Sequence, residues 1–237
     1  MSEADDVRGI EAAAVRALDL IEDGARVGLG SGRAAAAFVA RLGARRREGL
    51  RVVGVATSDA TARQARDLGI PLIELDEDVE LDLTIDGADE VAPNLDLVKG
   101  WGGALVRERI VASASRRQVI LVGHEKLVRA IGEHGRIPVE VIPFARGPAM
   151  RHLKSLGLRP TLRTPPESGR PMLTDSGNVL LDCAPREPLR DGPAARALEA
   201  ALLAIPGVVD TGLFLGTAER VIVGYPDGRV VVLEGRP

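Results

Sequence analysis

The spacing of apolar residues in the first half of the chain alternates between helical and strand-like. Helical spacing extends over residues 7–21, 33–47, 59–68 and 104–115. Short apolar runs typical of buried strands occupy residues 26–29, 51–56, 70–75, 81–85 and 118–123. Because helices and strands alternate, we expect a parallel sheet that is covered by helices on both faces.

The pattern changes beyond residue 132. Helices are expected over 148–156 and 194–204, and a hairpin over 172–182. An apolar segment at 138–144 precedes the first of these helices, and a proline-rich stretch at 160–171 separates that helix from the hairpin. Together they predict a smaller α+β unit, and two further strands within 221–233 are expected to return to the first domain. We therefore predict an α/β domain from residues 1–132 and 207–237, interrupted by a smaller α+β domain from residues 133–206.

Polar loops follow three of the strands in the first half. These loops are 30–32, 57–58 and 86–89. In open α/β sheets the carboxyl ends of the strands form the ligand-binding edge, so we expect the three loops to converge on one crevice. The glycine turn lacks the third glycine of a dinucleotide site, since Arg33 stands in its place, and it has no Walker A lysine. A small phosphorylated ligand is therefore a better interpretation than a nucleotide.

Ionisable residues are concentrated between residues 81 and 114. Asp86 and Asp89 follow a strand, Lys99 precedes a glycine-rich loop that leads into a helix, and Glu108 lies on that helix. The free N–H groups and positive dipole end of such a helix suit an anion. Each carboxylate taken singly is more often a helix or turn cap, but the combination favours acid–base chemistry on an anionic substrate.

The composition narrows the class of partner. The net charge of −3 and pI near 5.7 give no reason to expect nucleic acid or an anionic membrane. The single cysteine, Cys183, excludes an internal disulfide, the N-terminal residues are polar and acidic, and no apolar run approaches the length of a membrane span. We expect a cytoplasmic protein. His124, His134 and His152 show no metal-ligand spacing, so no metal site is predicted.

The sequence resembles a known family, ribose-5-phosphate isomerase type A. The residues that carry the resemblance are Asp86-Gly87-Ala88-Asp89-Glu90, Leu97-Val98-Lys99-Gly100, Gly102-Gly103-Ala104-Leu105 and Arg107-Glu108-Arg109-Ile110-Val111-Ala112. Weaker matches occur in order along nearly the whole chain, among them Lys126-Leu127-Val128, Thr174-Asp175-Ser176-Gly177-Asn178 and Ile205-Pro206-Gly207-Val208-Val209.

The resemblance implies a fold and a reaction. The fold is a Rossmann-like domain interrupted by a smaller ferredoxin-like one, and relatives are often homodimers or tetramers. The reaction interconverts ribose 5-phosphate and ribulose 5-phosphate through an enediolate, in the pentose phosphate pathway, without a metal or organic cofactor. By resemblance, Glu108 moves the proton between carbons 1 and 2 and Lys99 stabilises the oxyanion. Asp86 and Asp89 then serve ring opening and proton transfer.

The expected substrate-binding residues are drawn from the glycine loops, the hydroxyls and one lysine. They are Gly30, Ser31, Gly32, Arg33, Thr57, Ser58, Gly100, Trp101, Gly102, Gly103 and Lys126. Three positions depart from the family pattern. Arg33 stands where the family has a hydroxyl and either clamps the phosphate or points to solvent; Glu125 replaces a serine; and Trp101 replaces a glycine, where an indole covers the sugar, narrows the site or packs between domains.

Two other classes of function remain open from the sequence. One is an isomerase of a different phosphosugar, with Trp101 and Arg33 reshaping recognition. The other is a non-catalytic sugar-phosphate-binding effector domain, which the full acid–base set and the lack of a DNA-binding segment disfavour.

Overall fold

The computed structural model describes residues 3–190 and 192–235. It divides into two compact units. The first unit comprises Met1–Ala88, Arg107–Leu127 and Thr217–Pro237, and the second comprises Asp89–Val106 and Val128–Gly216.

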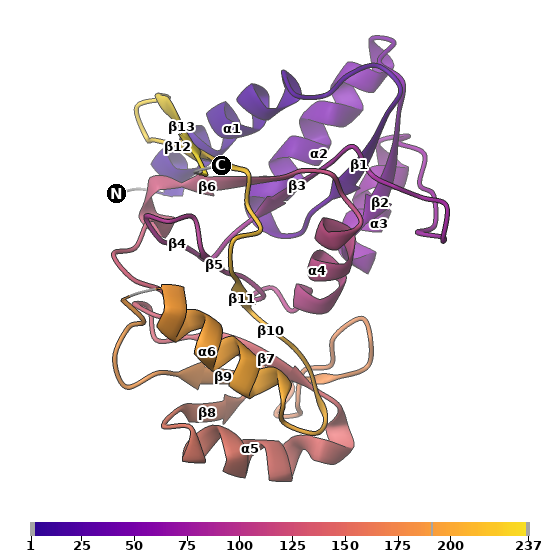
Figure 1. The fold of residues 1–237 in the computed structure, drawn as a ribbon. Helices are drawn as coiled ribbons and strands as arrows, with labels where there is room; N and C mark the ends of the chain where they lie inside the picture. Colours follow the sequence, from indigo (N-terminus) through magenta and orange to yellow (C-terminus); the bar gives the residue numbers. More distant parts are fainter. Residues whose placement is uncertain (1–2, 191, 236–237) are drawn as a thin grey trace. The chain divides into compact units, whose positions relative to one another are not determined.

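The first unit contains a six-stranded sheet (Figure 1). Its strands are β1 (Ala25–Leu29), β2 (Val52–Ala56), β3 (Leu83–Gly87), β6 (Gln118–Gly123), β12 (Arg220–Gly224) and β13 (Val230–Glu234), in the order β13-β12-β6-β3-β1-β2. Every neighbouring pair is parallel except β12 and the edge strand β13. The carboxyl ends of β1, β2, β3 and β6 therefore lie at one edge of the sheet.

Helices cover both faces of this sheet, as the alternation of elements predicts. Their bounds are α1 (Glu3–Leu18), α2 (Gly32–Arg47), α3 (Asp59–Asp67) and α4 (Leu105–Ser113). Buried residues of α1, α2 and α3, such as Ala14, Phe38 and Ala65, share one core cluster with Val27 of β1. On the other face Val111 of α4 clusters with Val55 of β2. Side chains alternate along each strand, which is why one sheet supports two cores.

The second unit is built on a four-stranded antiparallel sheet. Its strands are β7 (Ile137–Val141), β8 (Arg159–Leu162), β9 (Val179–Ala184) and β10 (Val208–Thr211), in the order β10-β7-β9-β8. Helices α5 (Arg146–Ser155) and α6 (Gly192–Leu203) pack on one face, where Leu153 and Leu202 join the cluster around Val139 and Leu181. This arrangement of strands and helices confirms the predicted α+β unit.

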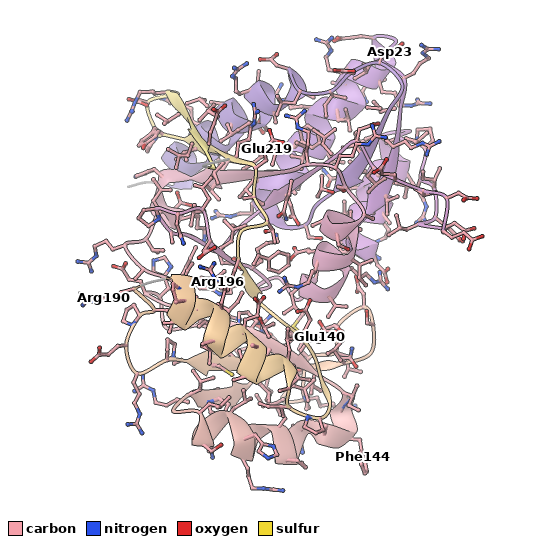
Figure 2. All side chains as sticks on the ribbon, in the orientation of Figure 1. Asp23, Glu140, Phe144, Arg190, Arg196 and Glu219 are labelled. Atoms are coloured by element: carbon pink, nitrogen blue, oxygen red, sulfur yellow. The ribbon has the colours of Figure 1, made fainter. Side chains whose placement is uncertain are left out.

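The opposite face of the four-stranded sheet is polar. Glu140 of β7 is almost fully buried there and accepts hydrogen bonds from Thr174 and Asn178 (Figure 2). A short three-stranded sheet completes the second unit: β4 (Glu90–Val91), β5 (Leu97–Val98) and β11 (Leu213–Phe214), in the order β11-β5-β4. Two 3-10 turns, η1 (His124–Lys126) and η2 (Pro143–Ala145), follow β6 and β7.

The predicted fold class is confirmed, but two predicted segments differ in detail. Residues 70–75 do not form a strand; only Leu72 makes a bridge, to Gly54, because the ladder is limited to the bonds of Gly54 with Pro71 and Ile73. Conversely, β8 extends into the proline-rich stretch 160–171, since Pro160 lies at a sheet edge where its missing N–H is tolerated.

The compact units divide the chain at other points than the expected ranges 1–132, 207–237 and 133–206. Residues 89–106 belong to the second unit. Whether the expected ranges mark separate domains stays a prediction. Among the described residues, no helix is long and apolar enough to cross a membrane.

Candidate active site

Asp86 is the fully buried carboxylate at the end of β3. Its Oδ1 accepts hydrogen bonds from the N–H groups of Ser31 (3.0 Å) and Gly87 (2.7 Å). The chain at Gly30 passes so close that a Cβ there would lie 2.2 Å from this oxygen. Residues 30–32 form what we call the glycine loop, and glycine at position 30 is therefore required for this loop to reach Asp86.

Four hydroxyls form a connected group behind the glycine loop, which we call the hydroxyl cluster: Ser31, Thr57, Ser58 and Thr61. Thr57 Oγ1 donates to Leu29 O at 3.1 Å, so Ser31 Oγ is the donor in its 2.7 Å bond to Thr57. Thr61 Oγ1 donates to Gly30 O at 2.9 Å. The cluster thus holds the backbone of the glycine loop in place through hydrogen bonds.

Thr61 was not among the residues predicted from sequence. The signal is present, because Thr61 lies three residues after the N-cap of α3 and faces back toward it. Ser58 is that N-cap, and its hydroxyl accepts from Thr61 N at 3.1 Å.

Two helix N-termini begin next to the hydroxyl cluster. Ser31 is the N-cap residue of α2 and Ser58 that of α3. Positive dipole ends and hydroxyl groups together suit a phosphate. Arg33, in the first turn of α2, is exposed. Exposure fits both alternatives considered for this residue, so its role as a phosphate clamp stays a prediction.

Glu108 and Lys126 complete the predicted residues of the first unit. Glu108 lies in the first turn of α4 and is 5% exposed. Lys126 lies in η1, directly after β6, and is half-buried. Ser31, Thr57, Asp86 and Lys126 thus lie at or just beyond the carboxyl ends of four neighbouring parallel strands, as their sequence positions predict.

In the second unit the decisive segment is residues 99–103, which we call the lysine loop. Lys99 is 2% exposed, its N–H donates to Gly212 O at 2.9 Å, and its Nζ lies 5.5 Å from the ring centroid of Phe214. Asp89 contacts the same loop, since its Oδ2 accepts a hydrogen bond from Trp101 N at 2.9 Å. Lys99 and Asp89 are thereby organised by the same short segment.

Glycines shape the lysine loop. Gly100 has φ 96° and Gly103 has φ 91°, values in the left-handed region that other residues adopt only with strain. Gly103 also packs closely on the face of the four-stranded sheet that carries Glu140, where a Cβ would lie 3.5 Å from Leu180 Cδ1 of β9. The same Cβ would lie 2.7 Å from Cε of Met172, which precedes β9 in the chain. The loop therefore rests directly on that sheet.

The side chain of Trp101 packs within the second unit. Its Nε1 donates to Arg136 O at 3.0 Å, its ring meets His134 edge-on at 6.0 Å, and the Arg136 guanidinium lies 5.2 Å from the ring centroid. Of the roles considered for the indole, packing is the one for which the structure supplies partners.

Glu90 supports the residues that Trp101 contacts. It is fully buried and accepts from the N–H groups of Gly132 (2.6 Å) and His134 (2.7 Å). Burial raises the pKa of Glu90, while these hydrogen bonds act in the opposite direction. Sequence reasoning quoted this residue only as part of a motif and gave it no role.

Arg163, beyond the end of β8, was also missed. It is 9% exposed and pairs with Asp182 of β9 through Nε (3.0 Å) and Nη2. Burial opposes ionisation of Asp182, but hydrogen bonds from Arg163 and Arg136 outweigh it and lower the pKa of the carboxyl. No sequence motif signalled the pair, because Arg163 and Asp182 meet through the β8–β9 register.

The predicted site residues thus form two ordered groups. Asp86, Glu108, Lys126, Thr57 and the glycine loop belong to the first unit, while Asp89 and the lysine loop belong to the second. Among the described residues, no group of three or more His, Cys, Asp or Glu side chains is placed to hold a metal ion.

Comparison with known proteins identifies the same family as the sequence motifs. Residues 53–228 match the model of the family Ribose 5-phosphate isomerase A (phosphoriboisomerase A). The chain belongs to this family. Ribose-5-phosphate isomerase A of Gloeobacter violaceus is 52% identical over 221 residues, which are 92% of this chain and 93% of that protein. The protein of the same name from Roseiflexus castenholzii is 48% identical, over 94% and 93% of the two chains.

Solved structures of the family share the fold. Ribose 5-phosphate isomerase A from Methanocaldococcus jannaschii has a TM-score of 0.88 at 38% identity and covers 97% of this chain and 98% of its own. A D-ribose-5-phosphate isomerase in complex with phospho-erythronic acid has a TM-score of 0.89 at 36% identity, with 95% and 97% coverage. The likeness extends over both units.

Proposed function

We propose that this protein interconverts D-ribose 5-phosphate and D-ribulose 5-phosphate through an enediolate, without a metal or organic cofactor, as a step of the pentose phosphate pathway. The observation that carries the proposal is that the acid–base residues of the family motif are buried, in a chain that matches its relatives over nearly its whole length. Asp86, Lys99 and Glu108 are 0%, 2% and 5% exposed. Burying an ionisable group costs free energy, and groups buried in spite of this cost are concentrated at functional sites.

The chemistry assigns a role to each group. Glu108 removes the proton next to the carbonyl and returns it to the neighbouring carbon. Lys99 and N–H groups of the lysine loop stabilise the oxyanion that develops. Asp86 and Asp89 transfer protons at the ring and hydroxyl oxygens during ring opening.

Phosphate recognition is assigned to the first unit. The N-termini of α2 and α3, the hydroxyls of Ser31 and Thr57 and the ammonium of Lys126 supply donors and positive charge. Arg33, exposed in the first turn of α2, stays a predicted additional contact to the phosphate.

The test is conversion of ribose 5-phosphate by purified protein after chelator treatment, beside other aldose phosphates. We expect turnover of the ribose compound and uptake of solvent hydrogen at carbon 2 of recovered substrate, because an enediolate base exchanges with water. Equal or faster turnover of another aldose phosphate would assign a different substrate.

Glu108→Gln tests the proposed base. We expect kcat to fall by about 10²–10⁴-fold with an unchanged circular dichroism spectrum, because the amide cannot accept the proton. Glu77→Gln, an exposed glutamate of the same unit, is the matched control and should retain wild-type rates. Wild-type kcat in Glu108→Gln would remove this residue from the role.

We also propose that the chain self-associates and acts in the cytoplasm. Phe144 projects from the second unit with 96% of its surface exposed (Figure 2). Ile142, two residues before it, and Val209 of β10 are 41% and 39% exposed. An exposed phenylalanine among aliphatic side chains favours a protein contact. Sedimentation velocity that shows only a 25.0 kDa species would contradict self-association.

A further inference from the structure

Two successive carbonyl groups of the lysine loop accept hydrogen bonds from one guanidinium nitrogen. Arg163 Nη1 donates to Gly100 O and to Trp101 O, both at 3.0 Å. The other side of the same guanidinium is held by Asp182. Because the planar fork is fixed by the carboxylate, Nη1 has little freedom to follow a moving loop.

The peptide between Gly100 and Trp101 is held at both ends. Its carbonyl faces Arg163, and its N–H donates to Asp89 Oδ2 at 2.9 Å. A trans peptide directs its C=O and N–H in opposite directions, and the described residues contain no cis peptide bond. A hydrogen-bonded chain therefore runs from Asp182 through Arg163 and this peptide to Asp89, and each bond polarises the next.

The following peptide obeys the same geometry. Since Trp101 O faces Arg163, the N–H of Gly102 points away from the guanidinium. The left-handed conformation of Gly100 and Gly103 on either side makes these two orientations accessible to the backbone. With a different residue in place of Arg163, the same glycines would allow the peptides to rotate.

We propose that Arg163, held by Asp182, is a positioning residue that orients the Gly100–Trp101 and Trp101–Gly102 peptides for the isomerisation. It directs one N–H onto Asp89 and presents the N–H of Gly102 to the developing enediolate. Arg163 itself does not touch the reacting atoms. The inference rests on the proposed function, since it names what sets the oxyanion donors of that reaction.

Phospho-erythronic acid is a suitable probe. It is the ligand of a solved relative, and its carboxylate is a planar anion, as is an enediolate. In Arg163→Gln we expect kcat/KM for ribose 5-phosphate to fall about 10²-fold, as for loss of one oxyanion donor, with KM changed less than about threefold. The calorimetric Kd of phospho-erythronic acid should rise by a comparable factor.

Two further variants set the scale. Arg163→Lys keeps the charge but cannot hold Asp182 and both carbonyls, so its loss should be intermediate. Arg159→Gln, an exposed arginine on the adjoining strand β8, should match wild type in all three quantities.

The possible results separate the explanations. If Arg163→Gln lowers only the amount of active protein, so that kcat per active site and the Kd of the probe stay at wild-type values, Arg163 is merely structural and the inference is wrong. If wild type binds the probe but does not convert ribose 5-phosphate, the proposed function fails, and the change in Kd between wild type and Arg163→Gln still decides the inference. Absence of probe binding by wild type would contradict both.

Discussion

The hydroxyl cluster of the first unit and the lysine loop of the second are held in place by different kinds of interaction. Behind the glycine loop, the neutral hydroxyls of Ser31, Thr57 and Thr61 form several hydrogen bonds with one another and with backbone carbonyls. Under the lysine loop, two backbone carbonyls accept hydrogen bonds from one guanidinium, Arg163, whose carboxylate partner Asp182 also pairs with Arg136. Removing one member of a distributed neutral network costs little, whereas removing the carboxylate from a buried ion-pair group costs much.

The comparison also concerns pH. Hydroxyl bonds do not titrate in the range where proteins fold. The pKa of Asp182 is lowered in the folded state, so its contribution to stability is present above its unfolded pKa and is lost as pH falls through the folded value. The support of the lysine loop by Asp182 should therefore weaken in acid, while the hydrogen bonds of the hydroxyl cluster should not.

The largest effect is expected for Asp182→Asn. This change leaves the Arg163 guanidinium buried without its carboxylate and should lower the free energy of unfolding by about 3 kcal/mol at pH 7. The difference from wild type should begin to shrink below about pH 4, where Asp182 of the unfolded wild-type chain takes up a proton, and should disappear as pH falls through the lowered pKa of Asp182 in the folded state. Urea unfolding at several pH values measures this.

Glu167→Gln, an exposed carboxylate of the same unit, is the control and should follow wild type at every pH. A deficit in Asp182→Asn that is equally large at pH 3 and pH 7 would contradict the ionic explanation.

The two regions also differ in how far sequence predicts them. Asp86, Thr57 and Ser58 follow strands, so the rule that parallel strands end at one edge predicts their places from local pattern alone. Asp89, Lys99 and Gly100 are visible in the motif. The residues that hold them are not, because Arg163 lies in the proline-rich stretch 160–171, Asp182 ends the stretch 172–182, and no motif links the two.

The physical reason is that Arg163 and Asp182 come together through strand pairing. Their proximity depends on the register of β8 on β9, in which Pro160 pairs with Cys183 and Thr161 with Asp182. Hydrophobic periodicity fixes which face a residue occupies but not which residue on the next strand it meets. Trp101 could likewise be singled out as unusual while its partners, Arg136 and His134, could not, because Arg136 lies 35 residues further along the chain and no motif links the two.

An intermediate effect is expected for Gly30→Ala, which tests the close approach on which the glycine loop depends. The new Cβ would lie 2.2 Å from Asp86 Oδ1 and 2.5 Å from Asp86 Cα, so the backbone must move. Overpacking of this kind costs about 2 kcal/mol, and kcat/KM should fall as Asp86 shifts. Thermal unfolding and steady-state kinetics measure the two changes.

Gly102→Ala is the counterpart in the lysine loop. A Cβ at this position meets no atom within 4 Å, so the unfolding midpoint should change little. Equal stability losses in the two variants would show that close packing does not distinguish the two loops.

The smallest effect is expected for Thr57→Val, which removes one hydroxyl from the cluster while keeping the shape of the side chain. Thr57 is fully buried and bonds both Ser31 Oγ and Leu29 O, so the free energy of unfolding should fall by about 1 kcal/mol. Since no charge is involved, the loss should be the same at pH 7 and pH 4. Thr57→Ser retains the hydroxyl and should recover most of it, while Thr161→Val, exposed on β8, should change nothing. If Thr57→Val instead costs as much as Asp182→Asn, the hydroxyl cluster is not a distributed network, and the contrast between the two regions is wrong.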